Sequence, residues 1–163
     1  MDIHWGDIVL GHLFIGFVIG FLAAWSFERW AENKRWKKLK AEAGIEGTFT
    51  AYLFRKDFCD IVDYSQKSAD DEISYVKENI FKLVHRETNG NIWEGYIYMG
   101  TPKDGRIAWK YVKLDGELPA SKHRVGFKRC LVSDGPGKDG KPCRHFYLLG
   151  EDDYGNEILE RTL

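Results

Sequence analysis

The chain has 163 residues, enough for one domain and a short additional segment. It contains 24 Lys and Arg against 25 Asp and Glu, so the formal net charge is −1 and no overall positive field attracts a polyanion. This balance argues against general binding of nucleic-acid polymers. Because 44% of the residues are hydrophobic, the chain is too apolar to be intrinsically disordered.

Apolar residues are concentrated near the start of the chain. Residues 8–27 form a run of twenty residues without Asp, Glu, Lys or Arg. A helix of that length spans about 30 Å, the thickness of the hydrocarbon core of a bilayer. The preceding segment has no Lys or Arg, which argues against a cleaved signal peptide, and Trp5 and Trp25 lie near the ends of the run, as in aromatic belts. Residues 1–27 are therefore predicted to form a transmembrane helix, with a buried core helix as the alternative.

A basic segment follows the apolar run. Residues 28–43 lack Gly and Pro and hold six Lys and Arg against three Glu, so we expect the helix to continue as a juxtamembrane stalk that Gly44 ends. The positive-inside rule places the N-terminus outside and the remaining chain in the cytoplasm, as in a protein of the inner membrane. The basic side chains either lie against anionic headgroups or form a solvated helix face. Three cysteines without framework spacing agree with a reducing compartment.

Small residues form a stripe along the predicted membrane helix. Gly16 and Gly20 make a G-x-x-x-G pattern, which Ala24 extends and His12 begins. Such a stripe lets a second helix approach closely, and an imidazole is better placed at a helix interface than against lipid. We therefore predict self-association or packing on a partner membrane helix. The alternative is that the glycines have no specific role and that His12 reaches toward the membrane surface.

Beyond Gly44 the hydrophobic period changes from 3.6 to 2, so residues 44–163 are predicted to form an all-β domain. A capping-box pattern predicts a helix over 69–78, with a strand beginning at Ile73 as the alternative. Hairpin signals at residues 88–91, 103–105 and 153–155 indicate an antiparallel meander. The predicted strands are residues 47–55, 58–64, 79–87, 92–99, 106–114, 124–132, 144–149 and 156–161.

Large side chains occur on both faces of these strands. Trp93 and Ile97 share one face of their strand, whereas Tyr96 and Tyr98 share the other. A one-sided open sheet uses fewer aromatic residues, so we predict a small antiparallel β-barrel of seven or eight strands, filled or holding one small ligand. A β-sandwich is the alternative.

The order of these segments resembles a known family. A membrane helix, a basic stalk, residues 45–49 (IEGTF), residues 91–96 (NIWEGY) and residues 114–117 (LDGE) are similar to the small membrane-anchored β-barrel effectors of bacterial cyclic-oligonucleotide anti-phage systems. The resemblance implies a barrel that binds a nucleotide second messenger and helices that then assemble and disrupt the inner membrane. Members of that family usually carry two membrane helices where this chain has one. No motif aligns residue for residue, so the resemblance assigns no ligand-binding residue.

Two motifs suggest chemistry that their context does not support. Residues 135–141 match the spacing G-x-x-x-x-G-K of a phosphate loop, but Pro142 replaces the Ser or Thr and a strand is predicted next. Cys143, His145, Cys130 and His123 could ligate a metal, but they lack C-x-x-C spacing, which favours structural thiols. With no catalytic motif elsewhere, we predict a protein that is not an enzyme and uses no metal or cofactor.

Basic residues are concentrated in residues 122–145, which hold seven Lys and Arg and two Asp. Arg129 shares strand parity with Phe127, and Arg144 with Phe146, so both arginines are predicted to point where apolar side chains point. A hairpin centred on residues 136–137 places Arg129 opposite Arg144, where a bound phosphate would relieve their repulsion. The alternative is that both arginines spread into solvent and bind nothing.

Two functions follow from these features. The first is a single-pass membrane effector or sensor whose barrel binds an anionic, nucleotide-like ligand through Arg129, Arg144 and an aromatic platform of Trp93 or Trp109. The second is a non-catalytic accessory subunit of a larger membrane complex, with the barrel as a structural cap. The interior distinguishes them, because a sensor needs a polar or cationic site and a cap can be filled by packing.

Overall fold

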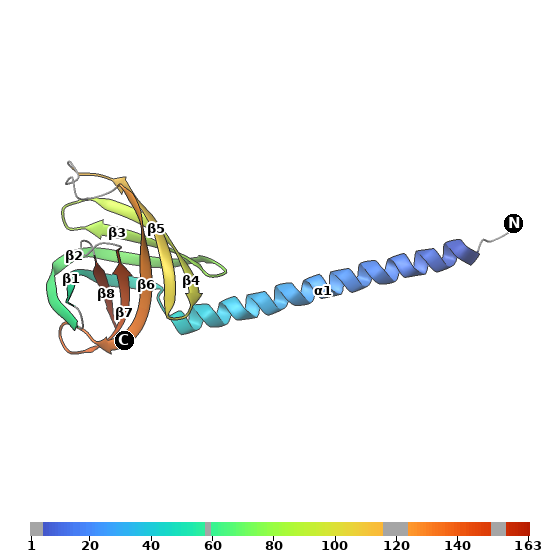
Figure 1. Ribbon diagram of the computed structural model, residues 1–163, viewed down its shortest axis with the longest axis horizontal. Coiled ribbons are helices and arrows are strands. Elements are labelled where there is room, and N and C mark those ends of the chain that lie inside the picture. Colours follow the sequence, from blue (N-terminus) through green and yellow to red (C-terminus); the bar gives the residue numbers. More distant parts are fainter. Residues whose placement is uncertain (1–4, 58–59, 116–123, 151–155) are drawn as a thin grey trace. The chain divides into compact units, whose positions relative to one another are not determined.

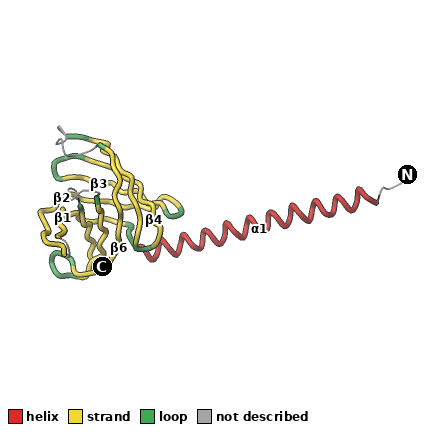
Figure 2. Tube along the Cα trace, viewed as in Figure 1, coloured by secondary structure: helices red, strands yellow, loops and turns green. Residues whose placement is uncertain are grey.

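The fold is one long helix followed by an all-β domain. The computed structural model describes residues 5–57, 60–115, 124–150 and 156–163 (Figures 1 and 2). The chain divides into two compact units, residues 1–38 and 39–163. The elements are α1 (Trp5–Ala43), β1 (Gly47–Asp57), β2 (Asp60–Lys77), β3 (Ile80–Glu87), β4 (Ile92–Thr101), β5 (Asp104–Lys113), β6 (Val125–Pro136), β7 (Pro142–Leu149) and β8 (Glu157–Thr162).

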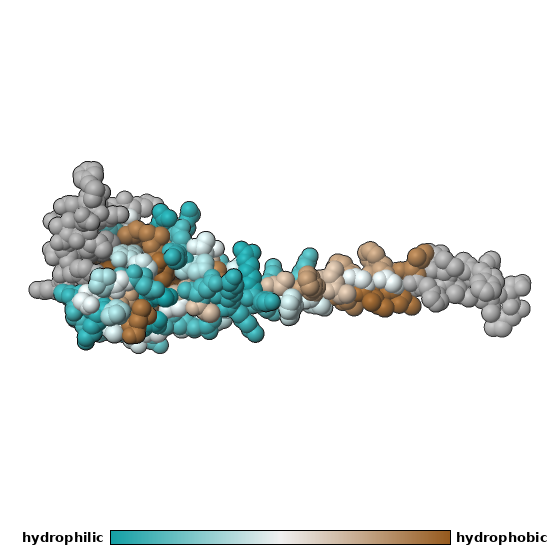
Figure 3. All heavy atoms as spheres, turned by 90° about the horizontal axis from the view of Figure 1, so that it is seen from below, coloured by the Kyte–Doolittle hydropathy of each residue, from teal (hydrophilic) through white to brown (hydrophobic). Residues whose placement is uncertain are grey.

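Helix α1 contains residues 5–27 of the predicted membrane segment and the whole predicted stalk. It is long and apolar enough to cross a membrane, and the apolar side chains of residues 13–27 are exposed along it (Figure 3). The helix ends at Ala43, as predicted, because Gly44 adopts a φ of +55° and its N–H donates to the Lys40 carbonyl oxygen at 3.1 Å.

The eight strands form a closed antiparallel barrel in the order β1 to β8, and β8 pairs with β1 to close it. The predicted meander barrel is therefore confirmed, and the β-sandwich alternative is wrong. The hairpin signals at residues 88–91 and 103–105 lie at the β3–β4 and β4–β5 connections. The third signal, at residues 153–155, lies outside the described residues.

The helix predicted over residues 69–78 is wrong, because β2 runs through this segment. Its side chains alternate with a period of two: Ala69, Asp71 and Ile73 are buried, whereas Asp70 and Glu72 are exposed. The acidic residues that resemble a helix start are therefore strand residues: Asp70 and Glu72 point outward, and Asp71 is a buried carboxylate. Tertiary pairing with β1 and β3 decides the structure here over the local capping pattern.

The end of the barrel that follows α1 is closed by the chain itself. Ala43 and Ile45 are fully buried. Arg161 donates hydrogen bonds to the carbonyl oxygens of Gly44 and Glu46. Beyond this closed end the interior is packed with fully buried apolar side chains from five strands: Phe81, Leu83, Ile97, Ile107, Phe146, Leu148 and Leu159.

The β6–β7 hairpin has a different register from the predicted one. Arg144 lies opposite Asp134, and Arg129 lies opposite Leu149. The turn centre falls later in the chain than predicted, in a tight turn where Gly140 adopts a φ of +79°. The prediction that Arg129 faces Arg144 across this hairpin is therefore wrong.

Candidate functional site

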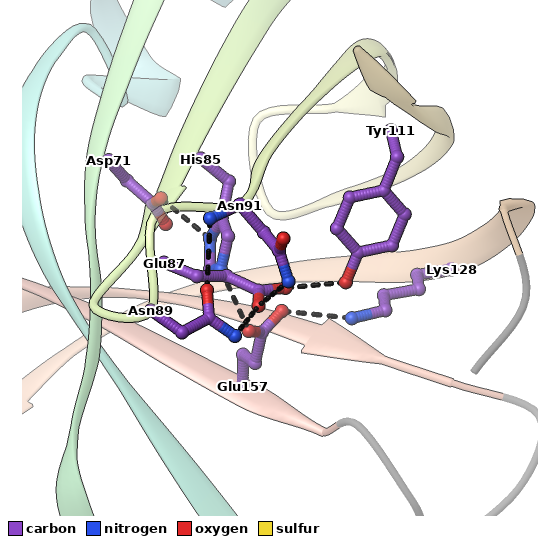
Figure 4. A network of polar contacts seen from close by, with 8 residues as sticks. All are labelled: Asp71, His85, Glu87, Asn89, Asn91, Tyr111, Lys128 and Glu157. Atoms are coloured by element: carbon purple, nitrogen blue, oxygen red, sulfur yellow. Dashed lines mark hydrogen bonds and ion pairs between the residues drawn. The ribbon is translucent and has the colours of Figure 1, made fainter. Parts of the chain in front are cut away.

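A layer of ionisable side chains crosses the barrel interior toward the end away from the closure (Figure 4). Asp71 of β2, His85 of β3, Lys128 of β6 and Glu157 of β8 all occupy inward positions of their strands, and strand pairing places Asp71 directly opposite His85. Asp71 and His85 are 0% and 1% exposed. We call these four residues the polar layer.

Short distances join the members of the polar layer into a chain. Asp71 Oδ1 lies 2.7 Å from His85 Nδ1, and His85 Nε2 lies 3.3 Å from Glu157 Oε1. Lys128 Nζ lies 2.9 Å from the other oxygen of Glu157. The imidazole therefore has a carboxylate at each nitrogen, and one of these carboxylates also binds the ammonium group.

Burial and mutual attraction set the charges of these groups. Burial raises the pKa of Asp71 to about 6, although the neighbouring His85 opposes the shift. Burial alone would lower the pKa of His85, but Glu157 and Asp71 outweigh it, and the pKa lies above its usual 6.5. Lys128 and His85 hold the pKa of Glu157 below its usual value against the effect of burial. Two cations therefore balance two carboxylates when all four groups are charged.

Aromatic rings cover one side of the polar layer. His85 stacks on Trp93 with ring centroids 4.3 Å apart, and Trp93 contacts Trp109 at 5.6 Å. Lys128 Nζ lies 5.5 Å and 5.8 Å from the centroids of these two indoles, within the range of a cation–π interaction. The Trp109 Nε1 atom is buried and has no hydrogen-bond partner among the described residues. An unpaired buried donor of this kind is uncommon in folded proteins.

A second polar group lies beside this layer, at the β3–β4 turn. The Tyr111 hydroxyl donates to Glu87 Oε1 at 2.5 Å, and the Asn89 and Asn91 amides donate to Glu87 Oε2 at 2.9 and 3.1 Å. Asn91 Oδ1 accepts from the backbone N–H of Asp115 at 2.8 Å. These bonds hold the turn against the end of β5 and keep Tyr111 next to Trp109, whose ring centroid lies 5.7 Å away.

The structure brings together only part of the predicted ligand site. Trp93 and Trp109 are adjacent inside the barrel. Arg129 lies on the outer face, where it binds Asp104 at 3.2 Å. Arg144 points inward, but toward the closed end, where it binds Asp134 at 2.5 Å and donates to the Ala43 carbonyl oxygen. The two arginines are therefore engaged at separate places, and neither belongs to the polar layer.

Sequence reasoning missed all four members of the polar layer. His85 shares strand parity with Phe81 and Leu83, and this alternation indicates that its side chain points into the barrel. Lys128 shares parity with Cys130, but the opposite parity of β6 carries Phe127 and looked more apolar. Asp71 lies in the segment predicted as a helix, so no inward strand position was predicted for it.

The described cysteines and histidines do not come together as a metal cluster. Cys130 faces the interior of the barrel, where burial raises its pKa. Cys143 and His145 lie on the opposite face of the sheet, because Cys130 pairs with Leu148 and inward positions alternate along β7. His145 Nε2 lies 3.3 Å from Glu160 Oε1. Within the described residues no group of three or more His, Cys, Asp or Glu is arranged to hold a metal ion. His123 and Cys59 lie outside the described residues.

The predicted helix stripe is open along α1. A Cβ atom added at Gly16 or Gly20 would meet no atom within 4 Å, and Ala24 is exposed. His12 lies within α1, and its side chain is outside the described part. The stripe is therefore available for another helix.

No family model matches the chain, and comparisons with curated proteins and with solved structures give no significant match.

Proposed function

We propose that this chain is a single-pass membrane protein whose β-barrel binds a small nucleotide-like ligand at the polar layer and reports binding through self-association of its membrane helix. Two features support the proposal. One is α1, which is long and apolar enough to cross a membrane. The other is the group of buried ionisable side chains beside an aromatic pair inside the barrel.

The polar layer is the observation that carries this proposal. Burying ionised groups costs several kcal/mol each before their mutual attraction is counted, and apolar residues of similar size fill a barrel without that cost. Neighbouring interior positions of the described strands are filled in that way, with fully buried apolar side chains such as Leu83, Ile107 and Leu148. Clusters of buried groups with displaced pKa values concentrate at binding and catalytic sites. The layer therefore supports a binding role more than a purely structural one.

The chemistry of the layer favours the base of a nucleotide over its phosphates. Asp71 and Glu157 offer carboxylate oxygens to ring N–H and amino donors, and Trp109 offers a half-buried aromatic surface and an unpaired N–H. Because Lys128 and His85 already balance the two carboxylates, the layer has no excess positive charge for a phosphate. Phosphate groups of such a ligand would lie outside the layer, toward exposed basic residues such as Arg124 at the start of β6.

The membrane part of the proposal follows from the charge of the stalk and the open stripe. Six basic residues after the apolar run favour an external N-terminus and a cytoplasmic barrel at the inner membrane. Gly16, Gly20 and Ala24 offer a surface through which ligand-bound copies associate. By its resemblance to membrane-anchored β-barrel effectors, the protein would act in anti-phage defence.

Ligand binding is tested by thermal shift on the full chain in detergent micelles. The probes are cyclic dinucleotides, cyclic trinucleotides and the four ribonucleoside monophosphates. We expect at least one probe to raise the melting temperature, and Trp109→Phe to reduce that shift because it removes the indole N–H and part of the ring. Trp30→Phe on the exposed face of α1 is the matched control and keeps the full shift. The proposal fails if no probe stabilises the chain, or if both variants respond equally.

The packed interior favours a second candidate function, an accessory subunit of a larger membrane complex. Phe81, Ile97 and Phe146 are fully buried, so the barrel is stable in the role of a cap without a ligand. This candidate predicts no nucleotide response, and it predicts co-purification of the chain with a defined membrane partner in mild detergent. Loss of that partner in Gly20→Ile, with no nucleotide response, would favour this function.

A further inference from the structure

The outer face of strands β4 to β6 exposes large apolar and aromatic side chains. Phe127 and Val125 of β6 are 75% and 64% exposed, and Tyr96 and Tyr98 of β4 are 46% and 47% exposed. We call this surface the Tyr96–Phe127 face. Isolated exposed apolar residues are common, but a contiguous group of this kind marks an interaction surface.

Strand pairing shows that these side chains are contiguous. Tyr96 lies opposite Ala108, and Ala108 lies opposite Phe127, so the three residues form one row across the sheet. Val125 is two positions from Phe127 on the same face of β6. Neighbouring strands are about 4.8 Å apart, so the row places two aromatic rings within about 10 Å of each other.

Positive charge surrounds this row. Arg106 and Lys110 of β5 flank Ala108 on the outer face, and both are exposed. The other charges nearby cancel in pairs: Lys82 binds Glu94 at 2.9 Å, and Arg129 binds Asp104 at 3.2 Å. Among the described residues, Arg106 and Lys110 form no ion pair. Lys110 lies opposite Glu94, and Arg106 helps to lower the pKa of Asp104, but these two carboxylates are shared among four basic side chains. The face therefore combines aromatic side chains with a local excess of positive charge.

We propose that the Tyr96–Phe127 face binds the surface of an anionic lipid bilayer. Tyr and Phe side chains partition into the headgroup region, and Arg and Lys beside them attract anionic lipids. A second copy of the same face would bring Arg106 and Lys110 against their own equivalents, which like-charge repulsion opposes. A bilayer matches both the aromatic row and the cations.

The membrane segment makes such binding efficient. The apolar run ends at Phe27, and the barrel unit begins at Leu39. The eleven residues between them reach at most about 17 Å as a helix, so the proposed membrane anchor, on which this inference rests, would limit how far the barrel moves from the bilayer. Even weak affinity of the face for lipid then gives substantial occupancy, because the local concentration is high. This inference does not depend on ligand binding by the polar layer.

The test uses the full chain in nanodiscs with a polarity-sensitive fluorophore at Val125→Cys. Native chain treated in the same way provides the labelling blank, and Glu72→Cys, exposed on β2, provides the control position. We expect lipid-borne nitroxide to quench the Val125 label in discs containing about one-third anionic lipid, and to quench it several-fold less in zwitterionic discs. The Glu72 label stays unquenched in both.

Charge reversal provides the second arm of this test. Arg106→Glu with Lys110→Glu, placed in the Val125→Cys chain, abolishes the quenching in anionic discs, whereas the melting temperature stays unchanged because both side chains are exposed. Equal quenching at the two label positions, or quenching that survives charge reversal, overturns the proposal. Energy transfer between labelled copies without lipid quenching also overturns it, and assigns the face to a second copy of the chain.

Discussion

The imidazole of His85 stacks on the indole of Trp93, with ring centroids 4.3 Å apart and ring planes 22° apart. The stack uses one face of the imidazole, and the two ring nitrogens at its edge remain available to polar neighbours. Asp71 lies at one of these nitrogens and Glu157 at the other. An imidazolium is favoured by both kinds of neighbour. The protonation of His85 is therefore coupled to the stability of the barrel.

The first prediction is that stability falls as pH rises from about 5 to about 8. The raised pKa of His85 contributes stability below 6.5 that is lost as pH rises through the pKa in the folded chain. The pKa of Asp71 rises from 3.8 to about 6, so the folded chain also loses stability as that carboxyl ionises between these values. Glu157 has a lowered pKa and contributes stability above 4.5 that is lost only in stronger acid. Circular dichroism melts of the full chain in detergent measure the slope.

The variant His85→Gln isolates this effect. Its melting temperature is lower overall, but it changes less with pH above about 6.5, because the titrating imidazole is absent. A native melting temperature that rises between about pH 5 and pH 8, or an unchanged slope in His85→Gln, would contradict the assignment.

The second prediction concerns the ammonium group inside the barrel. Lys128→Met removes the charge next to Glu157 and leaves a buried carboxylate with one cationic neighbour. Breaking a buried ion pair from one side costs about 3 kcal/mol, so we expect a loss of that order in the free energy of unfolding. Lys110→Met makes the same change on the outer face and costs less than about 0.5 kcal/mol. Urea titration of both variants gives the comparison, and similar losses would contradict the prediction.

The third prediction concerns a close approach between two strands. A Cβ atom at Gly126 would lie 2.8 Å from the Trp109 ring, so Gly126→Ala forces the indole to move. Overpacking of this kind costs about 1–3 kcal/mol, and we expect altered tryptophan fluorescence together with reduced stability. Gly100→Ala is the control, because the nearest atom to its Cβ is 3.8 Å away. Equal stability of the two variants would show that Trp109 is not held in this position.

The fourth prediction concerns the stripe on α1. Gly20→Ile places a branched side chain where helices would otherwise approach, so self-association of the full chain in detergent is lost. Val18→Ile adds a methylene group off the stripe and leaves association unchanged. Light scattering at a fixed ratio of protein to detergent measures the mass. A native chain that is already monomeric, or equal masses for both variants, would favour a different partner helix.

The sequence was sufficient to predict the helix and the barrel, because both depend on patterns that repeat over many residues. Twenty uncharged residues leave few alternatives to a membrane-type helix, and alternation with short turns leaves few alternatives to a meander. The segment 69–78 was misassigned because local acidic residues imitate a helix start. Only pairing with β1 and β3 explains why Asp71 is buried there.

The candidate site could not be predicted in the same way, because it depends on which parity of each strand faces inward. On β6 the more apolar parity, with Val125 and Phe127, faces outward, and the parity with Lys128 faces inward. A single strand cannot reveal this reversal, since a partner surface and a core both use apolar residues. The two tryptophans lie next to each other inside the barrel, but the polar side chains beside them come from β2, β3, β6 and β8 and meet only when the barrel closes.

The side chain of Lys128 lies against the aromatic pair formed by Trp93 and Trp109. Its ammonium group lies near both indoles and binds Glu157, so the lysine already occupies the position beside the rings where the proposed ligand would bind. Under the proposed function, ligand binding at this position would be an exchange reaction, in which the ligand displaces the lysine side chain. The affinity for such a ligand would then be the difference between its own binding free energy and that of the lysine side chain, so weakly binding molecules would not displace the lysine.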